Sequence, residues 1–139
     1  MNLVKHKDKL FALEKQIKEE LEEIELEVEH HYAEGTYTRV LKIPKGVVLT
    51  GKIHRYSCVN ILAQGKIRVV TDEGHYDLEA PYVFVSGPLV KKAGYALEDT
   101  IWINVHPWDG EMNLEQIENE VIVPPDQLEY EEKKWLGQQ

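Results

Sequence analysis

The sequence has few of the features that stabilise or target a small exported protein. It contains one cysteine, Cys58, so no disulfide can form within the chain. The N-terminal lysines Lys5, Lys7 and Lys9 are not followed by the apolar core of a signal peptide. No run approaches the roughly 18 apolar residues that a membrane helix needs. We therefore expect a soluble, unprocessed protein without a transmembrane segment.

Excess positive charge is also lacking. The 139 residues hold 16 lysines and arginines against 25 acids, a net charge of −9. Residues 1–29 carry −4, residues 109–139 carry −7, and residues 30–108 carry +2. A binder of nucleic acid or of an anionic membrane needs a basic face, so we expect neither partner. The sequence also lacks a phosphate loop, zinc-finger spacing and a serine-nucleophile elbow.

Residues 8–24 are predicted to form an acidic N-terminal helix. Apolar side chains recur at spacings of three and four and share one face, at Leu10, Leu13, Ile17, Leu21 and Ile24. An isolated helix of this length is marginal in water, so this face needs a partner. A helix that covers one end of the body and a helix that pairs with a second copy fit the sequence equally.

From Ile24 onward the apolar period is that of a strand. Ile24, Leu26 and Val28 alternate with glutamates, so residues 1–29 form a helix that leads into the first strand. Short apolar segments bounded by glycine or proline follow, at residues 36–43, 47–50, 53–63, 66–71, 75–78, 82–86 and 100–105. Short strands in this number, without a helix among them, indicate a β-sandwich or barrel over residues 30–108.

Residues 109–139 are predicted to form an acidic arm, part helical and part extended. Leu114, Ile117 and Val121 have helical spacing, and Pro124 and Pro125 then break the regular structure. Further anchors follow, at Leu128, Tyr130, Trp135 and Leu136. We expect this arm to lie over the barrel or over a neighbouring molecule.

The stretch from Gly51 to Gly65 carries the most informative pattern. As one strand, it places polar or ionisable side chains along one face, at His54, Tyr56, Cys58 and Asn60. A row of such groups on a central strand is typical of a cavity lining and not of a packed core. Residues 100–106 offer a second such face, at Trp102, Asn104 and His106. We predict that these side chains together line a ligand-binding cavity.

These stretches resemble the cupin superfamily. The resemblance covers roughly residues 32–107, in Pro44-Lys-Gly46, Gly51–Gly65, Val69-Val-Thr-Asp-Glu-Gly74, Ala80-Pro-Tyr-Val-Phe-Val-Ser86 and Gly94–Trp102 ending at His106. It implies a mainly β, double-stranded jelly-roll barrel whose cup opens between its sheets, often in a dimer. More narrowly, the sequence is similar to small cupin-fold proteins encoded by bacteriophages, which implies a place in the host cytoplasm or the virion.

Metal-binding cupins place two histidines one residue apart, then an acid and a glycine, with another histidine on a later strand. Here His54 matches the first histidine, but Tyr56, Asn60 and Ala93 stand at the other ligand positions. Tyrosine and amide groups are poor replacements for imidazole and carboxylate. The resemblance therefore implies no cofactor; a divalent metal bound by His54 and His106 is the alternative.

Lys91 and Lys92 lie in a predicted loop near Glu98 and Asp99. We interpret them as exposed partners in surface ion pairs, each worth less than about 1 kcal/mol. Cys58 has no nearby base in the sequence, so we interpret it as a small core side chain and not as a reactive thiol.

Two functions fit this sequence. The first is a non-enzymatic structural or interaction protein of bacteriophage origin, which oligomerises through its barrel and terminal arms as a homodimer or binds a virion or host protein. The alternative is a small-molecule-binding protein or enzyme that uses the cup lined by His54, Tyr56, Asn60 and His106. The incomplete metal motif favours the first. The resemblance in fold does not favour the second, because a fold by itself does not define a function.

Overall fold

The computed structural model describes residues 3–20, 25–71, 73–110 and 112–137. The elements in chain order are α1 (Leu3–Glu20), β1 (Glu27–Ala33), β2 (Thr36–Ile43), β3 (Val48–Thr50), β4 (Ile53–His54), β5 (Cys58–Gln64), β6 (Lys66–Thr71), β7 (Gly74–Glu79), β8 (Tyr82–Ser86), β9 (Ala93–Ala96), β10 (Thr100–Pro107), α2 (Leu114–Val121), β11 (Ile122–Val123), a 3₁₀ helix (Pro125–Gln127) and α3 (Leu128–Gly137). None of the described helices is long and apolar enough to span a membrane.

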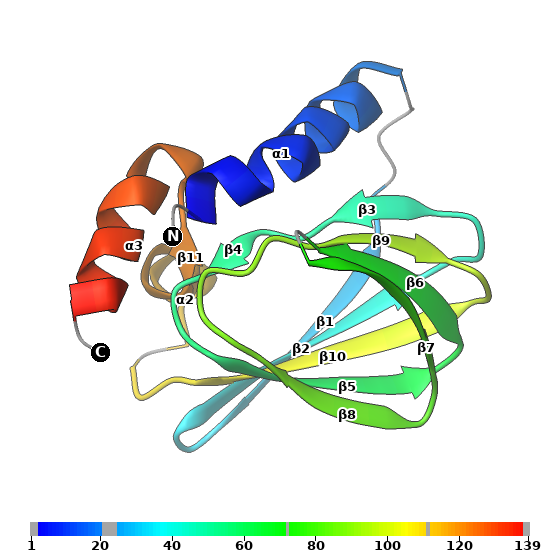
Figure 1. Cartoon of the computed structure of the whole chain (residues 1–139). Helices are drawn as coiled ribbons and strands as arrows, with labels where there is room; N and C mark the ends of the chain where they lie inside the picture. The colour runs from blue at the N-terminus through cyan, green and yellow to red at the C-terminus, as the bar shows by residue number, and fades with distance from the viewer. Residues whose placement is uncertain (1–2, 21–24, 72, 111, 138–139) are drawn as a thin grey trace.

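Two antiparallel sheets face each other, and the helices lie together on one side of them (Figure 1). The larger sheet has five strands in the order β1-β2-β10-β5-β8, and the smaller has four in the order β3-β9-β6-β7. A separate two-stranded pair joins β4 to β11. Because side chains alternate along each strand, one face of each sheet points inward and the other outward.

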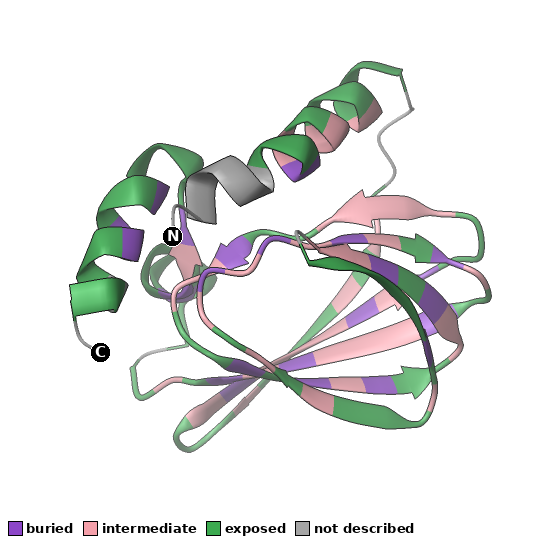
Figure 2. Cartoon of the chain, viewed as in Figure 1, coloured by how far each residue is buried: buried purple, intermediate pink, exposed green. Residues whose placement is uncertain are grey.

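The core lies between the inner faces of the two sheets. Figure 2 shows buried positions alternating with exposed ones along the strands. The buried cluster is aliphatic and draws on both sheets, with Leu41, Ile43, Leu62, Ile67, Val69, Leu78 and Ala96. At the turn between β5 and β6, Gly65 has a φ of +91°, and a Cβ there would lie 2.3 Å from the carbonyl oxygen of Asp99. Only glycine fits this turn.

The terminal segments pack on the body of their own chain. In α1, Leu10 is buried, Phe11 packs against the cluster formed by Ile53, Leu89, Val123 and Leu128, and Glu14 forms an ion pair with Lys91. In α2, Ile117 and Val121 pack with the buried ring of Tyr37. Of the two alternatives for the N-terminal helix, the structure therefore has the one in which it covers the body.

Most of the predicted strands are confirmed, and those over residues 36–43, 66–71 and 82–86 agree to the residue. The helix predicted over 8–24 starts earlier, at Leu3, and residues 21–24 lie outside the described part of the chain. Strand β9 was not predicted because its sequence, Ala-Gly-Tyr-Ala, has no β-branched residue.

The single strand predicted over residues 53–63 is wrong. β4 ends at His54 and β5 begins only at Cys58. Residues 55–57 leave the sheet because β4 pairs with β11, where Ile122 lies opposite His54. The backbone N–H of Arg55 then donates to the carbonyl oxygen of Val121 at 2.7 Å. A partner this distant in the sequence leaves no signal in the local pattern.

Candidate functional site

A cavity of about 400 Å³ lies between the two sheets, in the size range of small-molecule sites. Its polar wall comes mainly from the larger sheet, with Tyr37, Arg39, Asn60, Ser86, Trp102, Asn104 and His106, joined by His54 and Lys92. Its apolar wall includes Leu41, Ile43, Leu49, Ile67 and Val69. Helix α2 closes part of the cavity with Ile117, Glu118 and Val121.

Strand pairing fixes the order of the polar side chains. β10 pairs with both β2 and β5, so Asn104 lies opposite Arg39 on one side and opposite Asn60 on the other. β5 also pairs with β8, which places Phe84 next to Asn60. Cross-strand neighbours on one face are about 5 Å apart, so these four side chains form a continuous row across the inner face of the sheet.

Asn60 is the centre of a hydrogen-bond network. It is 1% exposed, and its amide nitrogen donates to the carbonyl oxygen of Cys58 at 3.2 Å and to Ser86 Oγ at 2.7 Å. Its amide oxygen accepts from Trp102 Nε1 at 3.1 Å and from Asn104 Nδ2 at 2.7 Å. All of its hydrogen-bonding capacity is therefore used within the protein. Asn60 positions its neighbours and has no group left for a ligand.

Lys92 places an ammonium group beside this network. Its Nζ donates to Ser86 Oγ and lies 5.3 Å from the centre of the Phe84 ring and 5.8 Å from that of Trp102. Within the described ranges, no carboxylate pairs with it. Burial lowers the pKa of Lys92, because leaving water disfavours the charged form. The remaining N–H donors of the ammonium group are available to a ligand.

Arg39 is the second cation of the polar wall. Like Lys92, it has no carboxylate partner among the residues that the structure describes. Burial, together with the nearby His106, Lys92 and Arg39, lowers the pKa of His54 to about 3. Burial and the charge of Arg39 also lower the pKa of His106. Both imidazoles are therefore neutral near pH 7.

The two histidines belong to a short aromatic stack. The rings of His54 and His106 are 4.9 Å apart and nearly perpendicular, at 88°. The ring of Tyr37 stacks on His106 at 6.0 Å, and the Tyr37 hydroxyl shares a hydrogen bond of 2.6 Å with His30 Nδ1. Burial raises the pKa of Tyr37 to about 12, so the phenol keeps its proton.

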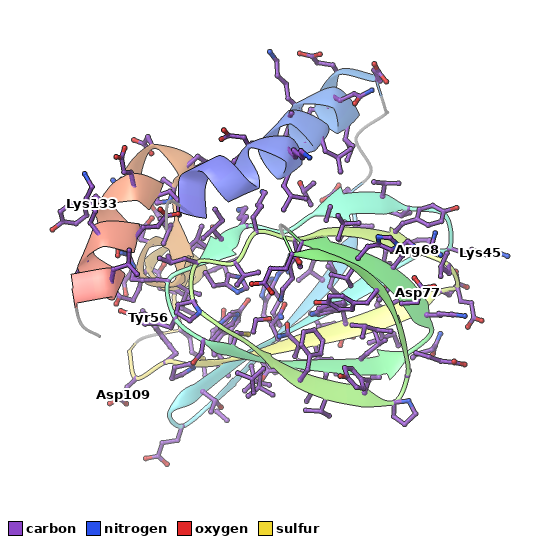
Figure 3. The ribbon with its side chains drawn as sticks, in the orientation of Figure 1. Lys45, Tyr56, Arg68, Asp77, Asp109 and Lys133 are labelled. Atoms are coloured by element: carbon purple, nitrogen blue, oxygen red, sulfur yellow. The ribbon has the colours of Figure 1, made fainter. Side chains whose placement is uncertain are left out.

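Most of the predicted lining residues meet in this cavity, namely His54, Asn60, Trp102, Asn104 and His106. Tyr56 does not, and its predicted place in the cup is wrong. Its side chain is 45% exposed, and its hydroxyl donates to Glu120, on the side of the molecule where the C-terminal helices lie (Figure 3). The cause is the departure of residues 55–57 from the sheet, which turns Tyr56 away from the cavity.

Cys58 lies behind the cavity wall and not in its lining. It is 2% exposed, and its Sγ lies 4.0 Å from His106 Nε2. Burial raises the pKa of the Cys58 thiol, as expected for a core residue.

The ligand set of metal-binding cupins does not fit these residues. The Tyr56 side chain points away from the cavity, and the Asn60 side-chain oxygen already accepts two hydrogen bonds from the protein. Ala93 has no side-chain atom that could bind a metal. The remaining donors, His54, Cys58 and His106, lie within 4.8 Å of one another. Lys92 and Arg39 line the same cavity as His54 and His106, and their positive charges disfavour a divalent cation there.

Arg39 and Lys92 are the residues that the sequence analysis missed. The interpretation of Lys91 and Lys92 as surface ion-pair partners of Glu98 and Asp99 is wrong. Lys91 is 4% exposed and bonds to Glu14 at 2.6 Å, while Lys92 faces the cavity. Alternation offered one usable signal: Arg39 stands between Tyr37 and Leu41, the inward positions of β2.

No protein-family profile and no curated protein sequence matches the chain. A cupin superfamily protein of Desulfitobacterium hafniense matches with a TM-score of 0.53 at 12% identity, over 65% of this chain and 84% of that one. KdgF of a Halomonas species matches with a TM-score of 0.51 at 18% identity, over 60% and 81%. An RmlC-like cupin family protein of Methanocaldococcus jannaschii matches with a TM-score of 0.52 at 13% identity, over 64% and 93%.

These similarities confirm the cupin jelly-roll fold that the sequence motifs predicted. At such low identities they establish the fold alone, because unrelated functions share one fold.

Proposed function

We propose that the protein binds a small organic anion in the cavity between its sheets. Lys92 and Arg39 hold the anionic group, and the apolar wall holds the rest of the ligand. The observation that carries this proposal is the unpaired positive charge of the cavity. Among the residues that the structure describes, its lining includes Arg39, Lys52 and Lys92 against a single carboxylate, Glu118.

An anion offsets a cost that the free protein carries. A cation removed from water is unfavourable unless an opposite charge compensates it. The lowered pKa of Lys92 reflects this cost, since burial is its largest cause. A bound carboxylate or phosphate adds charge-assisted hydrogen bonds from Lys92 and from the guanidinium group of Arg39.

Ser86 adds a neutral donor beside these cations. Its Oγ accepts hydrogen bonds from Asn60 and from Lys92, so its own hydroxyl proton is left for another acceptor. The neutral imidazoles of His54 and His106 each offer one N–H and one bare ring nitrogen. The site thus matches a ligand with several oxygen atoms.

The apolar part of the lining favours an organic ligand over an inorganic anion. Leu49, Ile67 and Val69 face the cavity from the smaller sheet, and Leu41 faces it from β2, next to Arg39. A phosphate ion alone leaves these side chains without contact, whereas an apolar ligand body gains about 25 cal/mol per Å² buried. We therefore expect aromatic or branched carboxylates to bind more tightly than phosphate.

A thermal-shift and fluorescence titration tests the proposal. The probes are benzoate, phenylacetate, succinate and citrate, each beside its neutral amide, with phosphate as the inorganic control. Trp102 lines the cavity and reports on it, and Trp102→Phe is the control for signals from the other tryptophans. We expect at least one carboxylate to raise the melting temperature and change the fluorescence, and its amide to do neither.

Two results argue against the proposal. Equal binding of a carboxylate and its amide, or no carboxylate binding at all, removes the role of Lys92 and Arg39. If binding disappears after EDTA treatment and returns with Zn²⁺, a metal ion, and not Lys92 and Arg39, supplies the positive charge that binds the anion.

The structural or interaction role expected from the sequence receives less support. That hypothesis needs terminal arms that reach another molecule, yet Leu10, Ile117 and Leu128 are buried against the body of the same chain. The expected bacteriophage origin, virion or host partner, and absence of a cofactor stay predictions.

A further inference from the structure

We infer that the protein reacts with its ligand, by forming an imine between the Lys92 side chain and the carbonyl group of an oxo acid. The inference rests on the proposed function, because the carboxylate of the oxo acid is the anion that the cavity binds. The cationic form of Lys92 attracts this anion, and the neutral amine reacts with the carbonyl group. Arg39 lines the same cavity and stays charged, so it holds the carboxylate while Lys92 reacts.

Lys92 lacks the carboxylate partner that would hold a proton on its amine. Over the ranges that the structure describes, no ion pair includes Lys92, and its hydrogen-bond partner Ser86 is uncharged. The rings of Phe84 and Trp102 border Nζ, with their centres at 5.3 and 5.8 Å. Burial lowers the pKa of Lys92. A lysine in an apolar pocket is activated as a nucleophile in this way, because a larger share of its amine is unprotonated.

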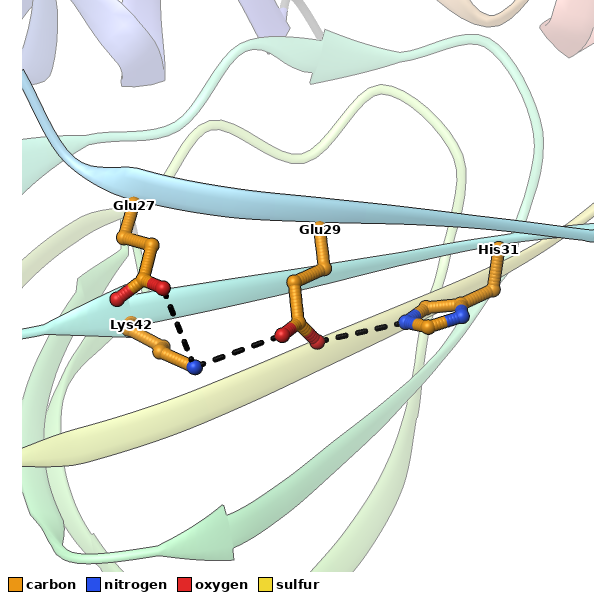
Figure 4. Close-up of polar contacts among 4 residues, drawn as sticks. All are labelled: Glu27, Glu29, His31 and Lys42. Atoms are coloured by element: carbon orange, nitrogen blue, oxygen red, sulfur yellow. Dashed lines mark hydrogen bonds and ion pairs between the residues drawn. The ribbon is translucent and has the colours of Figure 1, made fainter.

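Two other lysines show the contrast. Lys91, the preceding residue, is 4% exposed but bonds to the Glu14 carboxylate at 2.6 Å. On β2, Lys42 lies 3.4 Å from Glu27 and 3.5 Å from Glu29 (Figure 4). The hydrogen bond to Glu27 raises the pKa of Lys42. Carboxylates hold the protons on both of these amines, so we expect neither to react as Lys92 does.

The reaction is a condensation that needs no oxidant or reductant. The ammonium group of Lys92 first releases a proton to water, and the neutral nitrogen then attacks the carbonyl carbon to form a C–N bond. The carbonyl oxygen takes up one proton as the nitrogen loses one, which gives a carbinolamine. The hydroxyl group then leaves with a second proton as water, while the nitrogen loses its remaining proton and the C=N bond forms. One amine and one carbonyl group thus give one imine and one water molecule.

Ser86 stands where it can assist this step. Its Oγ accepts hydrogen bonds from Lys92 and from Asn60, so its own proton is free to be donated. A carbonyl carbon attacked by Nζ brings its oxygen next to this hydroxyl. A donor placed there stabilises the negative charge that develops on the oxygen during the attack.

The apolar part of the lining defines the rest of the oxo acid. Leu49, Ile67 and Val69 face the cavity, which has a volume of about 400 Å³. An aromatic or branched body buries apolar surface against these side chains, whereas pyruvate has almost none to bury. We therefore expect phenylpyruvate to react at lower concentration than pyruvate.

Reductive trapping of the full chain tests this inference. The protein is incubated with phenylpyruvate, pyruvate or 4-oxopentanoate and with sodium cyanoborohydride, which reduces an imine to a stable amine. Intact mass spectrometry then counts the adducts, and peptide mapping locates them, because the N-terminal amine also reacts with carbonyl compounds near pH 7. We expect one adduct per chain on Lys92, formed at least about 10-fold faster than on any other lysine, since the cavity holds the carbonyl group beside the amine.

Two conservative variants serve as matched controls. Lys92→Arg keeps the positive charge but has no nucleophilic amine, so it should lose the adduct and still bind a carboxylate without a carbonyl group, such as benzoate. Lys91→Arg should keep the adduct on Lys92. Circular dichroism and thermal melting establish that both variants are folded. 2-Pentanone, which has the shape of 4-oxopentanoate without its charge, should label Lys92 more slowly.

The outcomes separate this inference from the proposed function. If benzoate raises the melting temperature but no oxo acid labels Lys92, the inference is overturned and the proposed function stands. Labelling spread evenly over the exposed lysines, including Lys52 at the cavity, also overturns it. If 2-pentanone labels Lys92 as fast as 4-oxopentanoate does, Lys92 is a nucleophile but the recognition of the carboxylate, and with it the choice of an oxo acid, is refuted.

Discussion

Lys91 and Lys92 are neighbours in the sequence with different surroundings. We therefore predict that a methionine substitution at Lys92 lowers ligand affinity, whereas the same substitution at Lys91 lowers stability. Lys92→Met removes the ammonium group that faces the cavity and keeps the length of the side chain. We expect this variant to lose affinity for the anionic ligand without losing stability. Methionine is tolerated there because the Phe84 and Trp102 rings that flank Nζ also accept a thioether.

The size of the loss follows from the contacts of Nζ. In the free protein one N–H of Lys92 donates to Ser86, and the others are available to a ligand. Lys92→Met therefore removes at least one charge-assisted hydrogen bond to the ligand. Such a bond is worth about 1.5–3 kcal/mol, which corresponds to an affinity about 10- to 150-fold weaker. Unfolding free energy should stay level or rise, because the variant no longer buries an ammonium group without a carboxylate. Folding lowers the pKa of Lys92, so its charge destabilises the wild type at neutral pH, and this cost fades as the pH rises toward 10.5.

Lys91→Met is the matched control. Lys91 is 4% exposed and bonds to Glu14 at 2.6 Å and to the carbonyl oxygen of Gly51 at 2.7 Å. Its loss leaves the Gly51 carbonyl without this donor and leaves the partly buried Glu14 carboxylate with the Thr50 hydroxyl but no cation, at a cost of about 1–3 kcal/mol. We expect urea denaturation to show this loss while the fluorescence titration shows unchanged affinity. If Lys92→Met binds the anion as the wild type does, or if Lys91→Met weakens binding equally, the assignment of the two lysines is refuted.

Three further predictions concern stability. Folding lowers the pKa of His54 from 6.5 to about 3, so the folded state binds fewer protons than the unfolded state. The unfolding free energy should therefore fall as the pH drops from 6.5 toward 3, by up to about 5 kcal/mol. Urea titrations in which the unfolding free energy of His54→Asn falls with pH as steeply as that of the wild type would contradict this. Asn60→Leu leaves Trp102 Nε1 and Asn104 Nδ2 without the oxygen that accepts their hydrogen bonds. Urea denaturation should show an unfolding free energy lower by about 2–5 kcal/mol. A loss below about 1 kcal/mol would show that the network is dispensable for stability. Gly65→Ala should lower the unfolding free energy by more than about 2 kcal/mol, because the added Cβ meets the backbone of Asp99. Gly35 has a φ of +79° and no atom within 4 Å of an added Cβ, so Gly35→Ala should lower it by only about 1 kcal/mol. Equal losses in the two variants would contradict the steric explanation.

Much of the fold could be predicted from the sequence because its strands carry local signals. Alternating apolar residues bounded by glycine or proline located β2, β6 and β8 to the residue. Strand β9 lacked that signal, since Ala93–Ala96 is held in the smaller sheet by pairing with β3 and β6. Whether such a segment forms a strand depends on pairing partners that are distant in the sequence.

The candidate site was predicted less completely for the same reason. Asn60, Trp102 and Asn104 were placed correctly on the inner face because the pairing of β5 with β10 is regular from Val59 to Leu62, and its one irregularity lies beyond them, between Ile101 and Trp102. Tyr56 was misplaced because contacts with the C-terminal segment interrupt the strand after His54. Lys92 was missed because nothing in a lysine pair tells which member faces inward.

The central claim is that the cavity recognises negative charge through residues of the protein. Calorimetric titration of EDTA-treated wild-type protein with the tightest-binding carboxylate and with its amide measures this most directly. We predict one carboxylate bound per chain, and an amide that binds at least about 10-fold more weakly, the equivalent of one lost charge-assisted bond. Equal affinities for the two compounds, or no heat from any carboxylate tested, would contradict the claim.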